Sequence, residues 1–334
     1  MHRREAGLKH WRLGTFNLEN LDDRAGEDGG FEDRLAVLRP QLRRLRADVL
    51  CLQEVNAHTL DGKSGPRVPV GLERLLEGTE YARYRRVISM NRGGHRPSDH
   101  HNLVILSRFP ILSHGQVWHD LVPAPSIRAV TAKPACDQGQ PVEWDRPILH
   151  ACLDLGHGKV VQVVNVHLRA PRAAWLPGQK TEHGRWLSVG GWAEGFYLAA
   201  VKRAGQALEA RLLVEKMFDA DTQARLVVCG DFNCDDRESP LRTLMGDEED
   251  TGNGHLAARM LVPAERSVSE SQRYSVIHHG RKVMLDHILL SRPLLGDLIG
   301  CEVHNEALGD ELVSPARIWQ PPDSYHAPMV AEFS

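Results

Sequence analysis

A short apolar run that ends in polar residues limits the fold of this chain more than any other feature. Residues 226–229, Leu-Val-Val-Cys, have the apolar and β-branched character of a buried strand. Gly230 is expected to end the run and to let the chain turn. Asp231 and Asn233 follow at a spacing of two, so in an extended chain their side chains leave on the same face. We therefore expect a carboxylate and an amide side by side at the mouth of a core strand.

This pair of side chains suits chemistry on a phosphoester. An aspartate can orient or deprotonate water, and an asparagine amide can donate to a phosphate oxygen without adding negative charge. Glycine, aspartate and asparagine also favour ordinary turns, so residues 226–233 alone are compatible with either interpretation.

The same arrangement recurs along the chain. Other predicted strands carry an acid, an amide or an imidazole: residues 11–18 with Asn17, 48–55 with Glu54, 160–168 with His167, 283–290 with Asp286, and the last strand with His326 before it. Each signal alone fits a strand end or a hydrogen-bonded core residue. Active sites on sheet scaffolds are assembled from strand ends and their loops, so the set as a whole predicts one site. Asp286, placed inside a predicted strand, is costly to bury without a partner.

Composition indicates an ordinary globular protein with a large core. The chain has 334 residues, of which 42% are hydrophobic and 25% charged. The net charge of -3 provides no overall positive field, so any affinity for nucleic acid must be local. The six cysteines form no C-x-x-C pair, which argues against a zinc site or a disulfide framework. The charged N-terminus lacks the apolar region of a secretory signal, and no run approaches the ~20 apolar residues of a membrane span. A cytoplasmic setting is expected.

Helical segments are predicted between these strands. Phe31, Leu35, Leu38, Leu42 and Leu45 recur at helical spacing, and Pro40 among them predicts a kink or a break.

Two further segments follow the strand with His167. A long amphipathic helix is expected from Ala193 to about Ala220. The acidic residues 247–250 are expected to form a solvated loop, because they lack the spacing of a calcium-binding loop.

The ordered set of motifs resembles the endonuclease/exonuclease/phosphatase superfamily, which includes deoxyribonuclease I. The resemblance rests on Thr-Phe-Asn at 15–17, Leu-Gln-Glu-Val at 52–55, Asn-Val-His-Leu at 165–168, Gly-Asp-Phe-Asn at 230–233, Leu-Asp-His-Ile-Leu at 285–289 and Tyr-His-Ala-Pro at 325–328. It implies an α/β fold, a four-layer sandwich in which two mixed β-sheets pack face to face and are flanked by helices. We expect a single domain over residues 1–334.

The resemblance also implies a metal-dependent phosphodiester hydrolase. Glu54, helped by Asn17, is expected to bind Mg²⁺ or Mn²⁺, hard cations that suit carboxylate and amide oxygens. Water would attack phosphorus in line, and the cation and nearby donors would stabilise the charge that develops on the phosphoryl oxygens.

The remaining matched residues are expected to handle water, phosphate and protons. Asp231 and Asn233 would position the water and the phosphoryl oxygens, and His167 would contact the phosphate or protonate the leaving group. His326 would act on the water or the phosphate, with Asp286 orienting its ring. Whether Asp231 or His326 is the base stays open.

One position departs from the superfamily pattern. Many members carry an acid directly before the last histidine, where this chain has Tyr325. The change removes one negative charge and a candidate ligand for a second cation, which favours one tightly bound metal. Asp323 would substitute only if its loop folds back. A weakened or non-catalytic variant of the fold is the alternative.

An aromatic and basic insertion is expected at about residues 169–197, which contain three tryptophans, a phenylalanine and a tyrosine among basic residues and five glycines. Such a segment can stack bases along a phosphate backbone, close as a lid over a small phosphodiester, or pack its rings on the core. The substrate is thus expected to be a phosphodiester, with nucleic acid as the first class and a small molecule or lipid headgroup as the alternative. No protein partner is expected.

Overall fold

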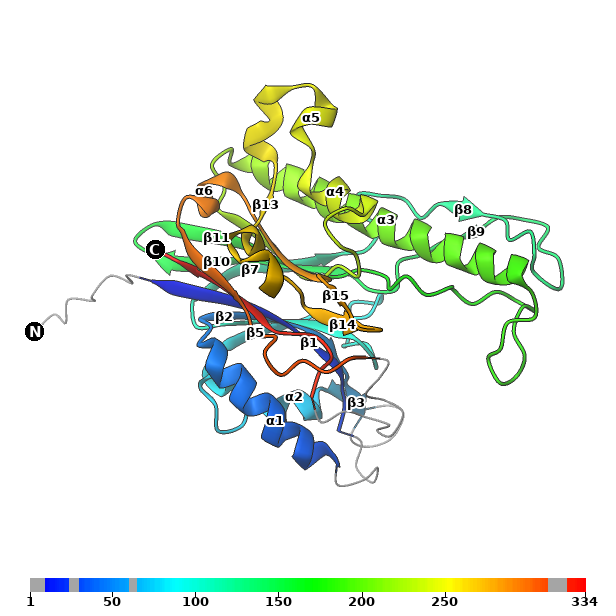
Figure 1. The fold of residues 1–334 in the computed structure, drawn as a ribbon, viewed down its shortest axis with the longest axis horizontal. Coiled ribbons are helices and arrows are strands. Elements are labelled where there is room, and N and C mark those ends of the chain that lie inside the picture. Colours follow the sequence, from blue (N-terminus) through cyan, green and yellow to red (C-terminus); the bar gives the residue numbers. More distant parts are fainter. Residues whose placement is uncertain (1–9, 24–29, 60–64, 312–322) are drawn as a thin grey trace, which may run out of the picture.

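Two six-stranded sheets lie at the centre of the molecule (Figure 1). The computed structural model describes residues 10–23, 30–59, 65–311 and 323–334. The first sheet has the order β17-β18-β1-β2-β6-β5 and the second the order β13-β16-β12-β11-β10-β7. In both sheets parallel and antiparallel neighbours occur, for example β1 parallel to β2 and antiparallel to β18. The prediction of two mixed sheets is confirmed.

The strands of the first sheet are β1 (Trp11–Leu21), β2 (Val49–Val55), β5 (Arg85–Ile88), β6 (Asn102–Ser107), β17 (Leu298–Val303) and β18 (Met329–Phe333). Those of the second are β7 (Ile111–Val117), β10 (Ile148–Gly156), β11 (Lys159–His167), β12 (Leu226–Asp231), β13 (Val262–Pro263) and β16 (Asp286–Leu290). Three small ribbons pair β3 (His58–Thr59) with β4 (Arg67–Val68), β8 (Ser126–Ile127) with β9 (Gln140–Pro141), and β14 (Val276–His278) with β15 (Arg281–Val283).

Four α-helices cover the outer faces of the two sheets (Figure 1). They are α1 (Gly30–Leu45), α2 (Val70–Leu76), α3 (Val189–Ala220) and α4 (Ser239–Met245). Of two shorter helices, α5 (Glu248–Thr251) buries none of its residues, and α6 (Arg292–Leu295) packs Leu294 into the apolar cluster between the sheets. Short 3₁₀ turns are η1 (Glu80–Arg83), η2 (Gly254–Arg259), η3 (Ala264–Ser267) and η4 (Glu270–Gln272).

Three apolar clusters show how the layers pack. One lies between the sheets and joins Leu13 and Cys51 of the first to Val163 and Cys229 of the second. Another packs α1 and α2 on the outer face of the first sheet. The third packs α3 and α4 on the outer face of the second. The predicted four-layer sandwich is therefore confirmed.

Helix α1 does not break at Pro40, so the break, one of the two outcomes that the sequence predicted there, is wrong. The helix is continuous from Gly30 to Leu45, with Pro40 inside it and exposed. Leu35, Leu38 and Leu42 lie on the other face and are fully buried against the sheet. Burial of these side chains on both sides of the proline outweighs the lost backbone hydrogen bond.

Other predicted boundaries also need correction. Helix α3 begins at Val189, four residues before the predicted start, because the Ser188 hydroxyl caps the first turn by accepting from the Gly191 N–H. Residues 247–250, predicted as a loop, contribute to α5, whose N-cap Asp247 accepts from the Asp250 N–H. The predicted strand 283–290 is two strands, and Asp286 begins β16 instead of lying inside a strand.

All six cysteines are free. Among the described residues, no helix is both long enough and apolar enough to cross a membrane.

Candidate active site

All seven predicted site residues meet at one end of the two sheets. Asn17 comes from β1 and Glu54 from β2, His167 ends β11, Asp231 ends β12, Asp286 begins β16, Asn233 follows β12 by two residues, and His326 precedes β18. The strands of both sheets end here, so residues far apart in sequence can form one site.

The register of the second sheet sets three of these side chains in a row. His167 pairs with Asp231 across the parallel strands β11 and β12. Asp231 pairs with Asp286 across the antiparallel strands β12 and β16. Three neighbouring strands thus present an imidazole and two carboxylates at the same level.

Gly230 has a different role from the predicted one. It lies within β12 and does not end the strand. Its φ of 138° is a conformation that side chains other than glycine rarely adopt. A Cβ at this position would collide with the backbone of Val166 on the neighbouring strand. Glycine therefore allows β11 and β12 to approach closely one residue before Asp231.

The first sheet is irregular where it reaches the site. The pairing of β1 with β2 shifts after Asn17, and the pairing of β2 with β6 shifts after Leu52. Glu54 has a φ of 60°, and Glu19 and Asn20 also have positive φ values, 48° and 54°. Bulges of this kind re-aim side chains and are frequent beside active sites. The bulge in β2 aims the Glu54 carboxylate at the second sheet.

Asn17 joins a carboxylate of each sheet. Its Nδ2 donates to Asp231 Oδ2 at 3.0 Å and to Glu54 Oε1 at 3.3 Å. His167 Nε2 lies 3.3 Å from Asp231 Oδ2 and 3.6 Å from Glu54 Oε1. Asn17, Asp231 and His167 are buried, so this part of the site is recessed from solvent.

Asn233 is held against Asp231 by a turn. Its backbone N–H donates to Asp231 Oδ1 at 2.8 Å, and its side-chain amide donates to Asp231 Oδ2 at 3.0 Å. The same amide donates to the carbonyl of Leu168. The side chains of Asp231 and Asn233 are adjacent, as the sequence predicts.

His326 and Asp286 form the expected pair. His326 Nδ1 lies 2.7 Å from Asp286 Oδ2, and His326 Nε2 lies 4.0 Å from Asp231 Oδ2. Burial alone would lower the pKa of His326, but the two carboxylates raise it well above its ordinary value. His326 is therefore an imidazolium at neutral pH, and Asp286 has the partner that its burial requires.

The other carboxylates of the site stay ionised. Burial alone would raise the pKa of Asp231, but His326, His167 and the Asn233 N–H hold it well below its usual range. Burial likewise opposes ionisation of Glu54, whose pKa is nevertheless lowered by the neighbouring charges, His167 foremost.

Two groups of side chains are close enough to share a metal ion. Ligand atoms of Glu54, His167 and Asp231 lie within 4.8 Å of one another, and so do those of Asp231, Asp286 and His326. The first group offers two ionised carboxylates, a donor set that suits a hard divalent cation. The buried Nδ1 of His167 has no hydrogen-bond partner among the described residues.

Further residues border Glu54 that the sequence analysis did not select. Asn20 donates its backbone N–H to Glu54 Oε2 at 2.9 Å, and its side-chain oxygen lies 2.6 Å from His101 Nε2. Arg146 Nη2 lies 2.8 Å from His101 Nδ1. Burial lowers the pKa of His101 to about 4, so the ring is neutral, donates to Asn20 and accepts from Arg146. No apolar run ends at these residues, but His101 directly precedes β6, as His326 precedes β18, and this signal could have revealed it.

The structure shows which acidic side chains lie near Tyr325, where the superfamily pattern has an acid. The carboxylate of Asp323 accepts from the Gln41 amide at 2.9 Å, so it is engaged with α1. Glu19 instead lies beside Tyr325, whose N–H donates to Glu19 Oε2 at 2.8 Å. Burial raises the pKa of Glu19. A carboxylate from β1 is thus present next to the position where the acid is missing.

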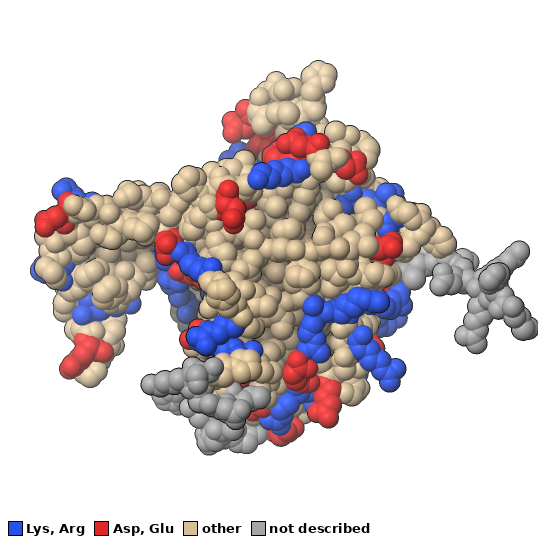
Figure 2. Space-filling view, turned by 180° about the vertical axis from the view of Figure 1, so that it is seen from behind, with Lys and Arg blue, Asp and Glu red and all other residues tan. Residues whose placement is uncertain are grey.

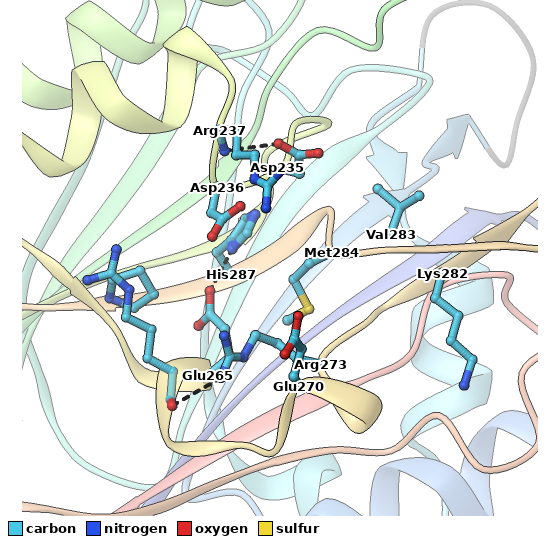
Figure 3. Close-up of a pocket in the computed structure, with 12 residues that line it drawn as sticks. Asp235, Asp236, Arg237, Glu265, Glu270, Arg273, Lys282, Val283, Met284 and His287 are labelled. Atoms are coloured by element: carbon cyan, nitrogen blue, oxygen red, sulfur yellow. Dashed lines mark hydrogen bonds and ion pairs between the residues drawn. The ribbon is translucent and has the colours of Figure 1, made fainter.

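A buried ion pair supports the site from the other face of β16. His287 Nδ1 lies 2.6 Å from Glu265 Oε1, and His287 Nε2 donates to the carbonyl of Cys234 at 2.9 Å. This pair forms the inner wall of a pocket of about 270 Å³ between the turn after Asn233, η3 and β15 (Figure 3). Its hydrogen bond to Cys234 fixes the segment that carries Asn233.

The rings of the aromatic segment do not pack on the core. Trp175 is 68% exposed, Trp192 45%, Phe196 41% and Tyr197 55%. The interpretation of residues 169–197 as a loop that buries its rings is therefore wrong for these four. Trp186 is half-buried, with the Lys180 ammonium 4.6 Å from the ring.

Comparisons with known proteins agree with this geometry. A family model described as "Endonuclease/Exonuclease/phosphatase family" matches residues 14–307. No curated protein matches the chain in sequence.

Several solved structures share the fold. The 3′ phosphatase NExo from Neisseria, solved with a product DNA hairpin, is 18% identical with a TM-score of 0.52, covering 97% of this chain and 99% of its own. A humanized D. rerio TDP2 is 13% identical with a TM-score of 0.55 and the same coverage. An endonuclease/exonuclease/phosphatase from Bacteroides vulgatus is 16% identical with a TM-score of 0.56, covering 98% and 99%. At these identities the likeness shows the fold.

Proposed function

The chain belongs to the endonuclease/exonuclease/phosphatase family, and we propose that it is a divalent-metal-dependent phosphodiesterase that cleaves nucleic acid. The observation that carries the proposal is the meeting of Glu54, Asp231 and His326 in one recessed cluster. Family members hydrolyse phosphoesters, and this cluster has the groups that such a reaction needs.

Glu54 and Asp231 are the side chains that would hold a divalent cation, Mg²⁺ or Mn²⁺. A bound cation would polarise the phosphoryl group and neutralise charge on its oxygens. Asn17 would become a ligand only if its amide turned, because its oxygen now accepts from the Glu19 N–H at 2.9 Å. Because Tyr325 stands in place of an acid, we propose one tightly bound cation. Glu19, which accepts from the Tyr325 N–H, is the carboxylate beside the position where a ligand for a second cation is missing.

The protonation states favour separate roles for Asp231 and His326. Asp231, an ionised carboxylate, orients the attacking water. His326, an imidazolium held by Asp286, donates to a phosphoryl oxygen as negative charge develops there. The water oxygen forms a bond to phosphorus while the bond to the leaving oxygen breaks in line.

His167 and Asn233 complete the proposed site. His167 Nε2 faces the two carboxylates, from where it can contact the phosphate or protonate the leaving oxygen. The Asn233 amide is fixed to Asp231 and can donate to a phosphoryl oxygen without adding charge.

Nucleic acid is the proposed substrate class. NExo was solved with a DNA hairpin, and other structures with this fold carry nuclease names, such as an AP endonuclease from Archaeoglobus fulgidus. The exposed aromatic rings and basic residues at 169–197 are a suitable surface for bases and phosphates.

A direct test incubates the protein with plasmid, single-stranded DNA and RNA, with Mg²⁺, Mn²⁺ or EDTA. We expect metal-dependent cleavage of at least one of these, and none by Glu54→Gln or His326→Gln. Asp219→Asn changes an exposed acid of α3 and should retain full activity. Cleavage that continues undiminished in both site variants would refute the assignment.

A small phosphodiester is the second candidate, favoured by the net charge of -3, since long polyanions usually meet a basic surface. In that case bis(4-nitrophenyl) phosphate would be hydrolysed while plasmid, single-stranded DNA and RNA remain intact.

A further inference from the structure

On the side of the second sheet, a part of the chain projects beyond both sheets (Figure 1). It consists of residues 126–142, which include β8 and β9, residues 169–188, and the first turns of α3, residues 189–197. We call these three segments the aromatic arm. Its middle segment begins two residues after His167, so the arm starts at the candidate active site.

Specific contacts hold the three segments together. The Glu194 carboxylate on α3 accepts from the N–H groups of Val130 at 2.6 Å and Thr131 at 2.8 Å. The Ala174 N–H donates to the Gly195 carbonyl at 2.8 Å. A Cβ at Gly195 would lie 2.5 Å from the Ala174 carbonyl oxygen, so glycine is what lets this segment lie directly on α3. The three segments of the arm are therefore fixed relative to one another.

The arm exposes several aromatic rings to solvent. Its rings include Trp175, Trp192, Phe196 and Tyr197, which are 41% to 68% exposed. Trp192 and Phe196 stack with centroids 5.6 Å apart. Residues 189–200 of α3 contain one charged residue, Glu194, and its carboxylate is already engaged by residues 130 and 131. A solvent-exposed helix face of this composition indicates a binding surface.

Charge distinguishes the arm from the rest of the molecule. The arm contains six basic residues, Arg128, Lys133, Arg169, Arg172, Lys180 and Arg185, and three acidic ones, Asp137, Glu182 and Glu194. It therefore carries +3, and because the whole chain carries -3, the remainder carries -6. Figure 2 shows the arm from behind, where charged side chains border a largely uncharged surface. On net charge, an anionic partner would be attracted to the arm more than to the rest of the chain.

Two basic residues, Arg169 and Arg172, lie between His167 and Trp175 in the chain. The Arg169 side chain is 25% exposed and bridges to Asp145 at 3.2 Å. The Arg172 side chain is 78% exposed and bridges to Glu311 at 3.1 Å. The segment that joins the site to the first exposed ring therefore carries two guanidinium groups.

We propose that the aromatic arm binds the unpaired bases of a single nucleic-acid strand whose phosphodiester lies in the active site. The proposal rests on the proposed function and names its substrate class. Trp175, Trp192 and Phe196 stack on bases, and the basic residues of the arm contact phosphates.

A flexible strand fits this geometry better than a flat lipid surface. The arm projects, whereas the site is recessed, with 2% of the side-chain surface exposed at both His167 and Asp231. A planar bilayer resting on the arm would be held away from those side chains, while a single strand can bend into the site. A duplex keeps its bases paired and offers few faces to the rings.

Binding is measured by fluorescence anisotropy with labelled oligo(dT), in EDTA so that no cleavage occurs. The variants are Trp192→Ala/Phe196→Ala and, on a separate segment, Trp175→Ala. We expect each to weaken oligo(dT) binding at least about fivefold, because stacking on one base contributes that much or more. Leu208→Ala, an equally exposed residue of α3 outside the arm, is the matched control and should bind as the parent does.

Unchanged oligo(dT) affinity in both arm variants, with their melting temperatures retained, would overturn the proposal. So would a parent that binds a blunt duplex of the same length as tightly as oligo(dT). Loss of binding to phosphatidylglycerol vesicles in the arm variants, with oligo(dT) binding unaffected, would assign the arm to a lipid surface instead.

The two proposals fail in distinguishable ways. If the parent hydrolyses neither nucleic acid nor bis(4-nitrophenyl) phosphate with any metal, the proposed function fails, while the EDTA binding assay still decides the role of the arm. If the parent cleaves single strands and the arm variants cleave them with unchanged KM, only the inference about the arm fails.

Discussion

Gln53 of the first sheet donates its side-chain amide to Asn165 of the second across 2.8 Å, beside the apolar cluster between the sheets, and to the buried hydroxyl of Thr15 at 3.1 Å. Asn165 in turn donates to the carbonyls of Leu52 and Val104 on the first sheet. Gln53 directly precedes Glu54, and Asn165 lies two residues before His167. The bridge therefore fixes the two sheets relative to each other directly behind the candidate site.

Asn165→Val removes this bridge at nearly constant volume. The carbonyls of Leu52 and Val104 and the amide of Gln53 would lose a partner while buried, so we expect a loss of about 2–4 kcal/mol in the free energy of unfolding. Urea denaturation measures the change. The exposed control Gln138→Val should shift it by less than about 0.5 kcal/mol. Equal stability of both variants would contradict the structural role of the bridge.

Glu54→Gln tests the proposed cation site. The substitution keeps size but removes the charge that would hold Mg²⁺, and we expect at least about a 100-fold loss of kcat/KM. Calorimetric titration of Mg²⁺ should show weaker binding than in the parent. EDTA should abolish activity of the parent and added Mg²⁺ or Mn²⁺ restore it. Full activity in EDTA would rule out the metal dependence.

Asp286→Asn tests how His326 is held. The amide cannot stabilise the imidazolium, so we expect kcat to fall about 10²- to 10⁴-fold with little change in KM. Because Asp286 raises the pKa of His326, its loss should move the alkaline limb of the pH–rate profile to lower pH. Asp219→Asn, an exposed acid on α3, is the control. An unshifted alkaline limb would show that His326 is not the group that titrates.

Glu265→Gln tests the ion pair behind β16. Burial alone would lower the pKa of His287, but Glu265 raises it, so the folded protein binds this proton more tightly than the unfolded chain. The stabilisation is fully present below the unfolded pKa of about 6.5 and is lost as pH rises through the folded value. The variant should therefore be destabilised more at pH 6 than at pH well above neutral. Urea denaturation across this range checks the slope; a constant difference would contradict it.

Gly230→Ala tests the close approach of β11 and β12. The Cβ would collide with the Val166 backbone in addition to straining the positive φ, so we expect a loss of about 2–4 kcal/mol. Gly158→Ala is the matched control, because its φ is 75° but open space surrounds it. It should cost only about 1 kcal/mol, the strain alone. Similar losses in both variants would show that the collision is relieved.

Sequence patterns located most of the strands and selected seven residues that the structure brings together, because apolar runs and the polar residues at their ends are local features. Glu54 and Asp231 are visible in this way without knowledge of the fold. The roles of His101 and Arg146 are not visible in this way, because they depend on contacts between distant residues: His101 Nε2 lies 3.8 Å from Glu54 Oε2, and Arg146 donates to His101. Glu19 was passed over because nothing local shows that Tyr325 lies next to it.

The errors in the helices have the same origin. Pro40 predicts a break by its own chemistry, but tertiary burial of the leucines around it decides the outcome. Val189 to Trp192 read as a glycine-rich loop, yet the Ser188 cap and the packing of Gly191 and Gly195 on the neighbouring segment start the helix there.

The position of β18 has a consequence for shortened forms of this chain. The strand lies between β17 and β1 in the first sheet, and His326 precedes it by three residues. A chain that lacks residues 326–333 therefore loses His326 and the neighbour of β1 together. The completeness of the candidate site and the closure of the first sheet thus depend on the same short segment.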